Sequence, residues 1–348
     1  MKIRMIRFLS LLAFLAGCSH DSTDFAPRVP LGDEARGVTL SGPLAGKRIY
    51  LLRDDINIPN CWKDSVHWTG SELYYAVSST NFTKLLAGIA NEAHPGCVLP
   101  AGQSDPYFDI YRAVVRTGGW EITRLGMNSN SVDAAMSLSG GTMAFTVFQS
   151  SDLWDVYFIN ETAANSWGAP VPFQRNSTCI EDNAELYAEG TRVIFESKRT
   201  DSTGSSCDSA ETRQLWYSEK DTGGNWSLPE LMTGAPNDGD KTSQPWVDEE
   251  NGYLYWTADS LCGCIRRVPF DGKIAIGAAE TVITPSIWEL ISGQDVDGKI
   301  VFVGEYSHAN GYAFIACGLA KGDVGGSDPN LYLGKWDITI NLCVIPLD

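Results

Sequence analysis

An all-β fold made of repeated small sheets is predicted by three observations on the sequence. A unit of about 45 residues recurs through the body of the chain. Short runs of aromatic and β-branched residues follow a turn glycine in each unit, as strands do. Prolines recur where long helices would have to run. Residues 43–348 are therefore predicted to form a β-propeller of five or six four-stranded blades.

The repeat is marked by glycines that each open a strand-like run, because glycine supplies the positive φ of a tight hairpin. The run from Arg192 to Phe195 is an example. Two insert-like segments, residues 81–106 and 200–212, widen the spacing, and without them the period is that of propeller blades. The marker glycines are Gly70, Gly141, Gly190, Gly252 and Gly298.

A single blade cannot bury both faces of its sheet, so stacked blades must close into a ring. The run from Gly46 to Leu52 is strand-like but has no full repeat of its own. We expect it to pair with C-terminal strands within residues 331–346 and to close the ring. Trp120, Trp167 and Trp226 recur at one position per repeat, and we interpret them as inter-blade packing.

The N-terminus indicates export. Basic residues at positions 2, 4 and 7 precede an apolar run, residues 8–16, and small residues precede Cys18. The Leu-Ala-Gly-Cys tetrad resembles the lipobox of bacterial lipoproteins, which implies a signal peptide of residues 1–17 and an acylated Cys18. Ser19 follows instead of Asp, which implies the outer membrane if the source is Gram-negative. Residues 18–42 are predicted to be the lipidated N-terminus and a flexible linker.

The formal net charge of −17 excludes classes of partner. Such a body repels nucleic acid and anionic lipid surfaces, so contact with the membrane is expected through the lipid anchor alone. No segment after the leader is long and apolar enough to span a bilayer. We expect a monomeric folded body tethered in the bacterial cell envelope.

Eight cysteines remain when Cys18 is acylated, and an even number in an exported protein indicates disulfides. Local pairs, each within one repeat, are expected: Cys61–Cys97, Cys179–Cys207 and Cys317–Cys343. Cys262 and Cys264 then pair with each other or stay reduced. The paired Cys-x-x-Cys modules of zinc sites are lacking, so no metal is expected. Residues 237–240 and 295–298 look like fragments of calcium loops without the distal Glu, which keeps calcium open as an alternative cofactor.

Several motifs recur at matching places in the repeats. The segment from Phe195 to Arg199 reads FESKR, and the strands that start at Asp109 and Asp155 read DIY and DVY. Trp-x-x-Pro turns end at Pro170 and Pro229. This pattern resembles WD40-like propeller repeats of the TolB type, best over residues 107–257. The resemblance implies a propeller that works through protein contacts at the mouth of its channel.

Signals for nucleophilic or metal-dependent catalysis are lacking. There is no Gly-x-Ser-x-Gly elbow, no phosphate-binding glycine loop, and no pair of histidines spaced as metal ligands. The leading hypothesis is therefore a non-catalytic envelope propeller that binds a protein or glycan partner.

Serial carboxylates keep an enzyme open as the alternative. Asp64, Asp133, Asp182 and Glu185 fall at or near the predicted starts of the innermost strands, beside the channel. In the binding hypothesis, Asp64, Asp133 and Asp182 are the candidate channel-mouth residues. In the alternative, Asp64, Asp133 and Glu185 supply the acid and base of a glycoside hydrolase or lyase. A repeated Asp can also cap turns, and a purely structural surface protein is the third reading.

Overall fold

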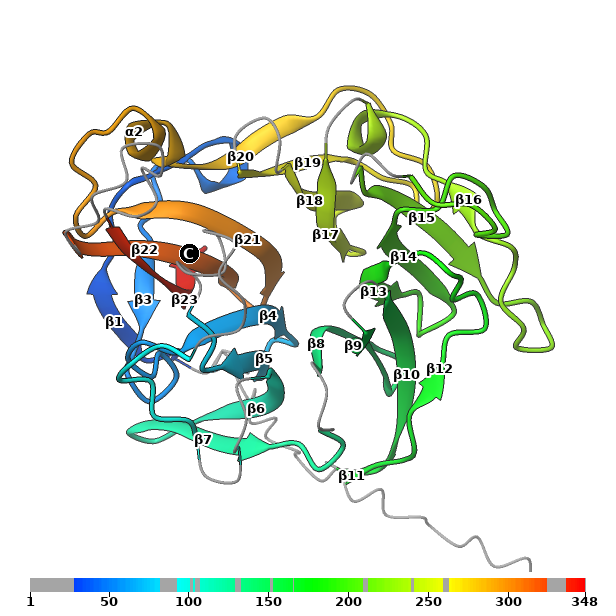
Figure 1. The fold of residues 1–348 in the computed structure, drawn as a ribbon, viewed down its shortest axis with the longest axis horizontal. Helices are drawn as coiled ribbons and strands as arrows, with labels where there is room; N and C mark the ends of the chain where they lie inside the picture. The colour runs from blue at the N-terminus through cyan, green and yellow to red at the C-terminus, as the bar shows by residue number, and fades with distance from the viewer. Residues whose placement is uncertain are drawn as a thin grey trace, which may run out of the picture.

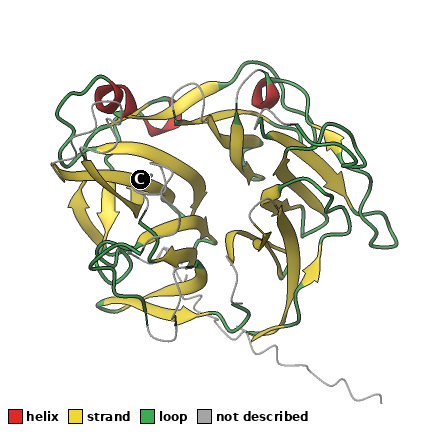
Figure 2. Ribbon diagram, in the orientation of Figure 1, coloured by secondary structure: helices red, strands yellow, loops and turns green. Residues whose placement is uncertain are grey.

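Five antiparallel sheets stand around a central axis in the computed structural model (Figure 1). Strands make up almost all of its regular structure (Figure 2). The structure describes residues 28–81, 93–100, 103, 107–128, 133–150, 153–164, 166–208, 212–238, 241–258, 263–323 and 336–347. The predicted β-propeller is confirmed, and the number of blades is five.

The first three blades follow the chain outward from the axis. Blade 1 contains β4 (Trp62–Trp68), β5 (Glu72–Ser78), β6 (Asp109–Arg116) and β7 (Gly119–Arg124). Blade 2 contains β8 (Asp133–Ser139), β9 (Thr142–Ser150) and β10 (Leu153–Ala163), and both β11 (Ser166–Trp167) and β12 (Val171–Pro172) pair with β10. Blade 3 contains β13 (Glu181–Tyr187), β14 (Arg192–Ser197), β15 (Gln214–Glu219) and β16 (Glu230–Leu231).

The last two blades each take strands from the N-terminus. Blade 4 contains β17 (Thr242–Asp248), β18 (Tyr253–Ala258), β19 (Cys264–Pro269) and β20 (Glu280–Pro285), and β2 (Val38–Leu40) is added at its outer edge. Blade 5 contains β21 (Ile300–Ala309), β22 (Tyr312–Asp323) and β23 (Trp336–Pro346), followed by β3 (Tyr50–Leu52) and β1 (Leu31–Glu34). The short helices are η1 (Gly42–Leu44), η2 (Ala235–Asn237) and α2 (Ile287–Ile291).

The ring closes as the sequence predicts. β3 pairs with β23, with Leu51 opposite Cys343 and Tyr50 opposite Val344. β1 and β2, by contrast, come from residues that the sequence analysis assigned to the linker, and they extend the propeller toward the N-terminus. The predicted signal peptide, residues 1–17, and Cys18 lie outside the described residues. In the part of the chain that is described, no helix has the length and apolar character needed to cross a membrane.

The marker glycines lie at the same hairpin in four blades, whereas in blade 5 the predicted glycine is one strand too early. The first four marker glycines lie between the first and second strands of their blades, all with positive φ. Gly298 instead precedes β21, and the corresponding hairpin of blade 5 uses Asn310 (φ 46°) and Gly311 (φ 77°). The error arose because innermost strands are covered on both sides, so residues 299–303 read as the same apolar run as a second strand.

Aromatic side chains fill the space between blades. Trp226 of blade 3 stacks on Phe158 of blade 2, with ring centroids 5.2 Å apart. Trp120 is buried and packs edge-on against Trp68, and Trp68 contacts Phe314 of blade 5 at 4.9 Å. For Trp226 the inter-blade packing interpretation therefore agrees with the structure, and Trp120 shares a core cluster with Phe314 of blade 5 through Trp68 of its own blade.

Asparagine side chains extend the sheets in four of the five blades. In each case the amide oxygen accepts a hydrogen bond from a backbone N–H of the third strand, and the amide nitrogen donates to the carbonyl of the same residue, at distances of 2.8–3.2 Å. The amide thus imitates one residue of a paired strand. The pairs are Asn128 with Ile110, Asn176 with Val156, Asn237 with Leu215, and Asn57 with Leu342.

The three local disulfides are confirmed. They join Cys61 to Cys97, Cys179 to Cys207, and Cys317 to Cys343. Cys264 is also disulfide-bonded, whereas Cys262 lies outside the described residues.

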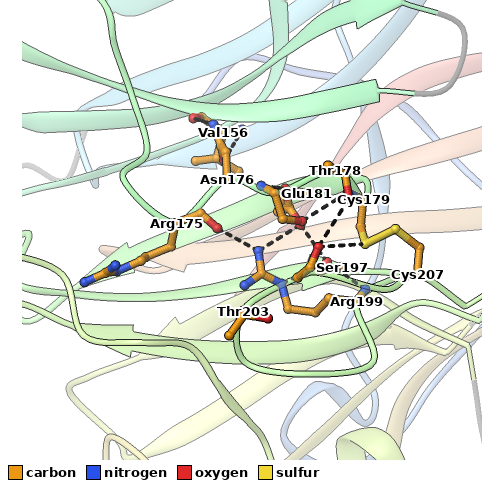
Figure 3. A network of polar contacts seen from close by, with 12 residues as sticks. Val156, Arg175, Asn176, Thr178, Cys179, Glu181, Ser197, Arg199, Thr203 and Cys207 are labelled. Atoms are coloured by element: carbon orange, nitrogen blue, oxygen red, sulfur yellow. Dashed lines mark hydrogen bonds and ion pairs between the residues drawn. A yellow bond between two sulfur atoms is a disulfide. The ribbon is translucent and has the colours of Figure 1, made fainter.

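The motif that resembles the TolB type is part of a buried network (Figure 3). The Glu181 carboxylate accepts hydrogen bonds from the Ser197 hydroxyl at 2.9 Å and from Arg199 at 2.8 Å. Both side chains of the Glu181–Arg199 ion pair are almost fully buried, and the guanidinium lies over the Phe195 ring. A buried, satisfied pair of this kind fixes β13 against β14. We therefore read this motif as structural.

Candidate functional site

One residue of each innermost strand has a left-handed backbone. These residues have φ between 43° and 60°, and the pairing of each strand with its outer neighbour shifts at the same place. Such bulges redirect side chains, and their left-handed backbone is strained for residues other than glycine. Five of them at equivalent positions are therefore a regular feature of the fold and not a set of irregularities. They surround the axis at one level. The five residues are Ser65, Ala135, Asn183, Gln244 and Glu305.

Side chains at these bulges connect neighbouring blades. The Ala135 N–H donates to the Ser65 hydroxyl at 2.6 Å, and the Glu305 N–H donates to the Gln244 amide oxygen at 3.0 Å. The Glu305 carboxylate in turn accepts from the Val66 N–H at 3.0 Å, which joins blade 5 to blade 1. The bulges therefore join blade 1 to blade 2, blade 4 to blade 5, and blade 5 to blade 1.

A second tier of contacts lies deeper along the axis. The Leu186 N–H donates to the Ser137 hydroxyl at 2.7 Å, the Val247 N–H to Glu185 at 3.2 Å, and the Trp68 N–H to the Ser307 hydroxyl at 2.8 Å. The cavity between the tiers measures about 30 Å³. That volume suits water and no larger molecule.

Above the first tier the axis widens into a cavity of about 560 Å³, here called the axial pocket. Its volume falls in the range of small-molecule sites. Four aromatic side chains line it beside a set of carboxylates and cations. The aromatic residues are Trp62, Phe108, Trp154 and Phe302, and the charged residues are Asp64, Asp182, Arg213, Lys241 and Glu305.

Asp64 and Glu305 form a carboxyl pair in this pocket. Their carboxyl groups interact directly, and each shifts the pKa of the other. Burial raises the pKa of Asp64. Burial, and then the neighbouring charge of Asp64, raises the pKa of Glu305 well above its usual range. Two carboxyls in this arrangement share one proton, because like charges at contact distance cannot both ionise.

Asp182 lies on blade 3 in a different environment. One of its oxygens is 3.1 Å from Arg213 Nη1, and the other accepts the Asn183 N–H at 2.8 Å. Arg213 also lies 3.4 Å from Glu196. These two carboxylates raise the pKa of the Arg213 guanidinium, so the cation is permanent. The pocket thus combines a carboxyl pair that shares one proton with a carboxylate that forms an ion pair with arginine.

The predicted site residues have separate locations. Asp64 and Asp182 both line the axial pocket. Glu185 instead belongs to the deeper tier, where burial raises its pKa well above the usual range. Asp133 begins β8, but its side chain lies outside the described part. Glu185 is therefore not beside Asp64 in the pocket, because the bulge at Asn183 changes which side chains reach it.

Three charged residues of the pocket, Arg213, Lys241 and Glu305, were not predicted from the sequence. Glu305 was overlooked because the last repeat was read in the wrong register, so residue 305 was not recognised as part of an innermost strand. Arg213 precedes β15 and has no repeat signal of its own. Among the residues that the structure describes, no group of three or more His, Cys, Asp or Glu side chains is arranged to hold a metal ion. The two calcium-like fragments remain untested predictions.

No protein-family model and no curated protein sequence matches the chain. Solved structures do match it. A protein described as a glycoside hydrolase has a TM-score of 0.45 at 8% identity, with 90% of this chain and 91% of that chain covered. A xylan β-1,4-xylosidase from Bacillus halodurans C-125 has 0.45 at 14%, covering 82% and 52%. A sialidase from Trypanosoma rangeli has 0.41 at 11%, covering 91% and 58%.

The leading hypothesis of a non-catalytic binder is corrected at this point, because the solved structures that match the chain are described as a glycoside hydrolase and a xylosidase, the class of the alternative. At 8–14% identity the similarity itself shows the fold alone. The chain also spans only about half of the xylosidase and the sialidase.

Proposed function

We propose that this protein is a propeller-fold glycoside hydrolase whose active site is the axial pocket. One observation carries the proposal. A carboxyl pair that shares a proton, Asp64 and Glu305, and a carboxylate bound to arginine, Asp182, line one aromatic pocket. Glycoside hydrolysis needs one protonated and one ionised carboxyl group on opposite sides of the scissile bond.

The separation of the two carboxyl groups distinguishes the known catalytic couples. Acid and nucleophile are about 5–5.5 Å apart in retaining enzymes, and acid and base about 6.5–9.5 Å apart in inverting ones. Asp64 and Glu305 interact directly, which is closer than either couple. We therefore treat them as a single general acid that protonates the leaving oxygen. Asp182, from the opposite side of the ring, is the ionised group that acts on the anomeric carbon or on the attacking water.

The rest of the pocket supports a sugar ligand. Trp62 and Phe108 lie edge to face, with ring centroids 4.8 Å apart, and both line the pocket. Flat apolar rings beside hydrogen-bonding groups suit a ligand that has apolar faces and a polar rim. The two tiers of contacts beneath the pocket leave room for water only. A pocket closed at its base favours attack at the end of a glycan chain.

We also propose the location that the N-terminus predicts. Export by the leader of residues 1–17 and acylation of Cys18 would tether the enzyme in the bacterial cell envelope, in the outer membrane of a Gram-negative source. The repeats would then be TolB-type blades carrying a catalytic pocket. Metabolic labelling with a fatty-acid analogue tests the anchor: the wild-type chain should incorporate it, and C18A should not. Equal labelling of both would reject the lipid anchor.

The catalytic proposal is tested with a panel of 4-nitrophenyl glycosides and envelope or plant polysaccharides. We expect hydrolysis of at least one member. On that substrate D182N and E305Q should each lower kcat/KM by about 10²-fold or more, the range of acid–base contributions. The matched control is E121Q, because Glu121 pairs with Arg116 on the exposed surface of blade 1. It should retain the wild-type rate.

Two results would reject the proposal. One is the absence of hydrolysis across the panel by the folded, disulfide-bonded protein. The other is hydrolysis that D182N and E305Q leave at the wild-type rate, which would mean that the pocket is not the catalytic site.

A further inference from the structure

The lining of the axial pocket is divided into two sides of different chemistry. Among the described residues, every side chain that blades 3 and 4 and the segments leading into their strands contribute to the pocket is polar or charged. Lys241, Ser243 and Thr257 are examples, and Asp182 lies among them. We call these residues the polar side.

Blades 1 and 5 form the other side, and its lining is mostly apolar. Trp62 and Phe302 are partly exposed there. Ala316 and Ile340 are buried, and all four belong to one hydrophobic cluster at the junction of the two blades. We call these residues the apolar side. It is a surface on which rings remain accessible from the cavity.

The carboxyl pair belongs to the apolar side. Asp64 lies on β4 of blade 1 and Glu305 on β21 of blade 5. Trp62 and Asp64 are two residues apart on β4, and alternate side chains of a strand share a face, so the indole ring lies beside the acid. Asp182 belongs to the polar side. The chemical division of the pocket therefore coincides with the division between the carboxyl pair and the ionised carboxylate.

This coincidence assigns a place to each half of a glycoside. The general acid protonates the oxygen of the leaving group, so the leaving group lies on the side of the acid. The sugar that keeps the anomeric carbon lies toward the ionised carboxylate. In the catalytic assignment proposed above, the leaving group therefore contacts the apolar side and the sugar contacts the polar side.

The apolar side offers few partners to a leaving group that has hydroxyls. Besides the carboxyl pair, the described part of its lining has one polar side chain, Ser65, whose hydroxyl already accepts the Ala135 N–H at 2.6 Å. A sugar in this place would bury hydroxyls without partners, which costs free energy. A flat apolar ring has no such groups and can pack against Phe302 and Trp62. The cavity of about 560 Å³ is large enough for a sugar and one ring together.

We infer that the substrates are aryl glycosides, in which a sugar is linked through oxygen to a phenol. The inference rests on the proposed function and names its substrate class. The proton of the carboxyl pair passes to the glycosidic oxygen as the bond between that oxygen and the anomeric carbon breaks. Water supplies the hydroxyl group that the sugar gains and the proton that the carboxyl groups regain. The products are a free sugar and a phenol.

Binding is measured first, because it does not depend on catalysis. Titration calorimetry compares two ligands that share one sugar, a phenyl thioglycoside and a sulfur-linked disaccharide, for glucose, xylose, arabinose and galactose. Sulfur in place of the glycosidic oxygen keeps both ligands from being consumed. F302L removes a flat ring and keeps an apolar side chain. W288A is the matched control, because Trp288 is an aromatic residue 60% exposed on α2.

For at least one sugar, we expect the phenyl thioglycoside to bind the wild type tenfold or more tightly than the disaccharide. F302L should weaken binding of the phenyl ligand by fivefold or more and that of the disaccharide by less than twofold. W288A should change neither.

Hydrolysis is measured on phenyl glycosides and on fluorinated alkyl glycosides whose alcohols are as acidic as phenol. The match in acidity removes the advantage of phenol as a leaving group. The wild type should favour the phenyl glycoside by tenfold or more in kcat/KM, and F302L should reduce that preference.

Three results overturn the inference. They are no binding of any phenyl thioglycoside, a disaccharide that binds as tightly as the phenyl ligand for every sugar, and an F302L variant that weakens both ligands equally. The failure of the catalytic proposal looks different. Preferred binding of the phenyl ligand by a protein that hydrolyses no glycoside would reject catalysis and keep aryl glycosides as the ligands. Hydrolysis of glycans without any preference for the phenyl group would reject the aryl substrate alone.

Discussion

Replacement of Glu185 by Gln should change how folding stability depends on pH. Glu185 is 5% exposed and accepts a hydrogen bond from the Val247 N–H at 3.2 Å. Burial raises its pKa well above the usual range, so the native carboxyl is neutral in mildly acidic solution. Glutamine keeps the acceptor, offers a donor where the acid has its proton, and cannot ionise. At about pH 4.5 the two proteins should therefore be similarly stable.

The sign and size follow from proton linkage. An unfolded Glu titrates near a pKa of about 4.3, and native Glu185 keeps its proton to higher pH. Between these values the native state binds one more proton than the unfolded state. Stability from this group is thus full below the unfolded pKa and falls by about 1.4 kcal/mol for each pH unit above it, until the native carboxyl ionises. E185Q lacks this loss, so its advantage over the wild type should grow by the same amount per pH unit.

Urea unfolding at pH 4.5, 5.5, 6.5 and 7.5 checks this, with tryptophan fluorescence and circular dichroism required to give coincident transitions. His67 has a pKa lowered to about 4 by burial and makes an opposite contribution between about pH 4 and 6.5. That contribution is present in both proteins and cancels in the difference. A stability difference between E185Q and the wild type that is constant over this range would refute the reasoning.

Two further predictions concern the fold. An added Cβ at Gly140 would lie 2.4 Å from the Glu189 carbonyl oxygen, whereas at Gly141 it would meet nothing within 4 Å, and both residues have positive φ. Thermal unfolding should therefore show G141A destabilised by about 1 kcal/mol and G140A destabilised by clearly more. Equal losses of stability in the two variants would contradict the contact at Gly140. N176A removes both hydrogen bonds between the side-chain amide and the Val156 backbone. The free energy of unfolding in urea should fall by about 1–3 kcal/mol, since backbone groups are left without partners. An unchanged urea midpoint would mean that water replaces the amide at no cost.

Much of the fold could be predicted because it depends on local signals. Hairpin glycines such as Gly190 and Gly252 mark the turn that follows an innermost strand. The number of residues between successive glycines is then enough to predict the blades. Ring closure by β3 was predictable for a similar reason, since a strand without a repeat needs a partner. The asparagine pairs were missed because the amide of Asn176 acts on Val156, 20 residues earlier. No short motif contains both partners.

The pocket could be predicted only in part. Asp64 and Asp182 were identified from their positions near the starts of strands, which is a property of the repeat. Glu305 interacts with Asp64 only because the ring brings blade 5 beside blade 1. The exclusion of Glu185 from the pocket depends on a bulge whose left-handed residue is Asn183, and a bulge has no signal in hydrophobic periodicity.

The order in which the chain is made contrasts with the order in which its parts meet. β1 and β3 are synthesised first, yet β3 pairs with β23, the last strand, and β1 pairs with β3. Lys47 donates a hydrogen bond to the Leu347 carbonyl across 300 residues of sequence. Until the C-terminal strand is complete, blade 5 has no outer wall and the early strands are unpaired edges, which are prone to self-association. Contacts at such separation also slow folding. Loss of the final dozen residues would therefore leave four blades formed and a ring that cannot close.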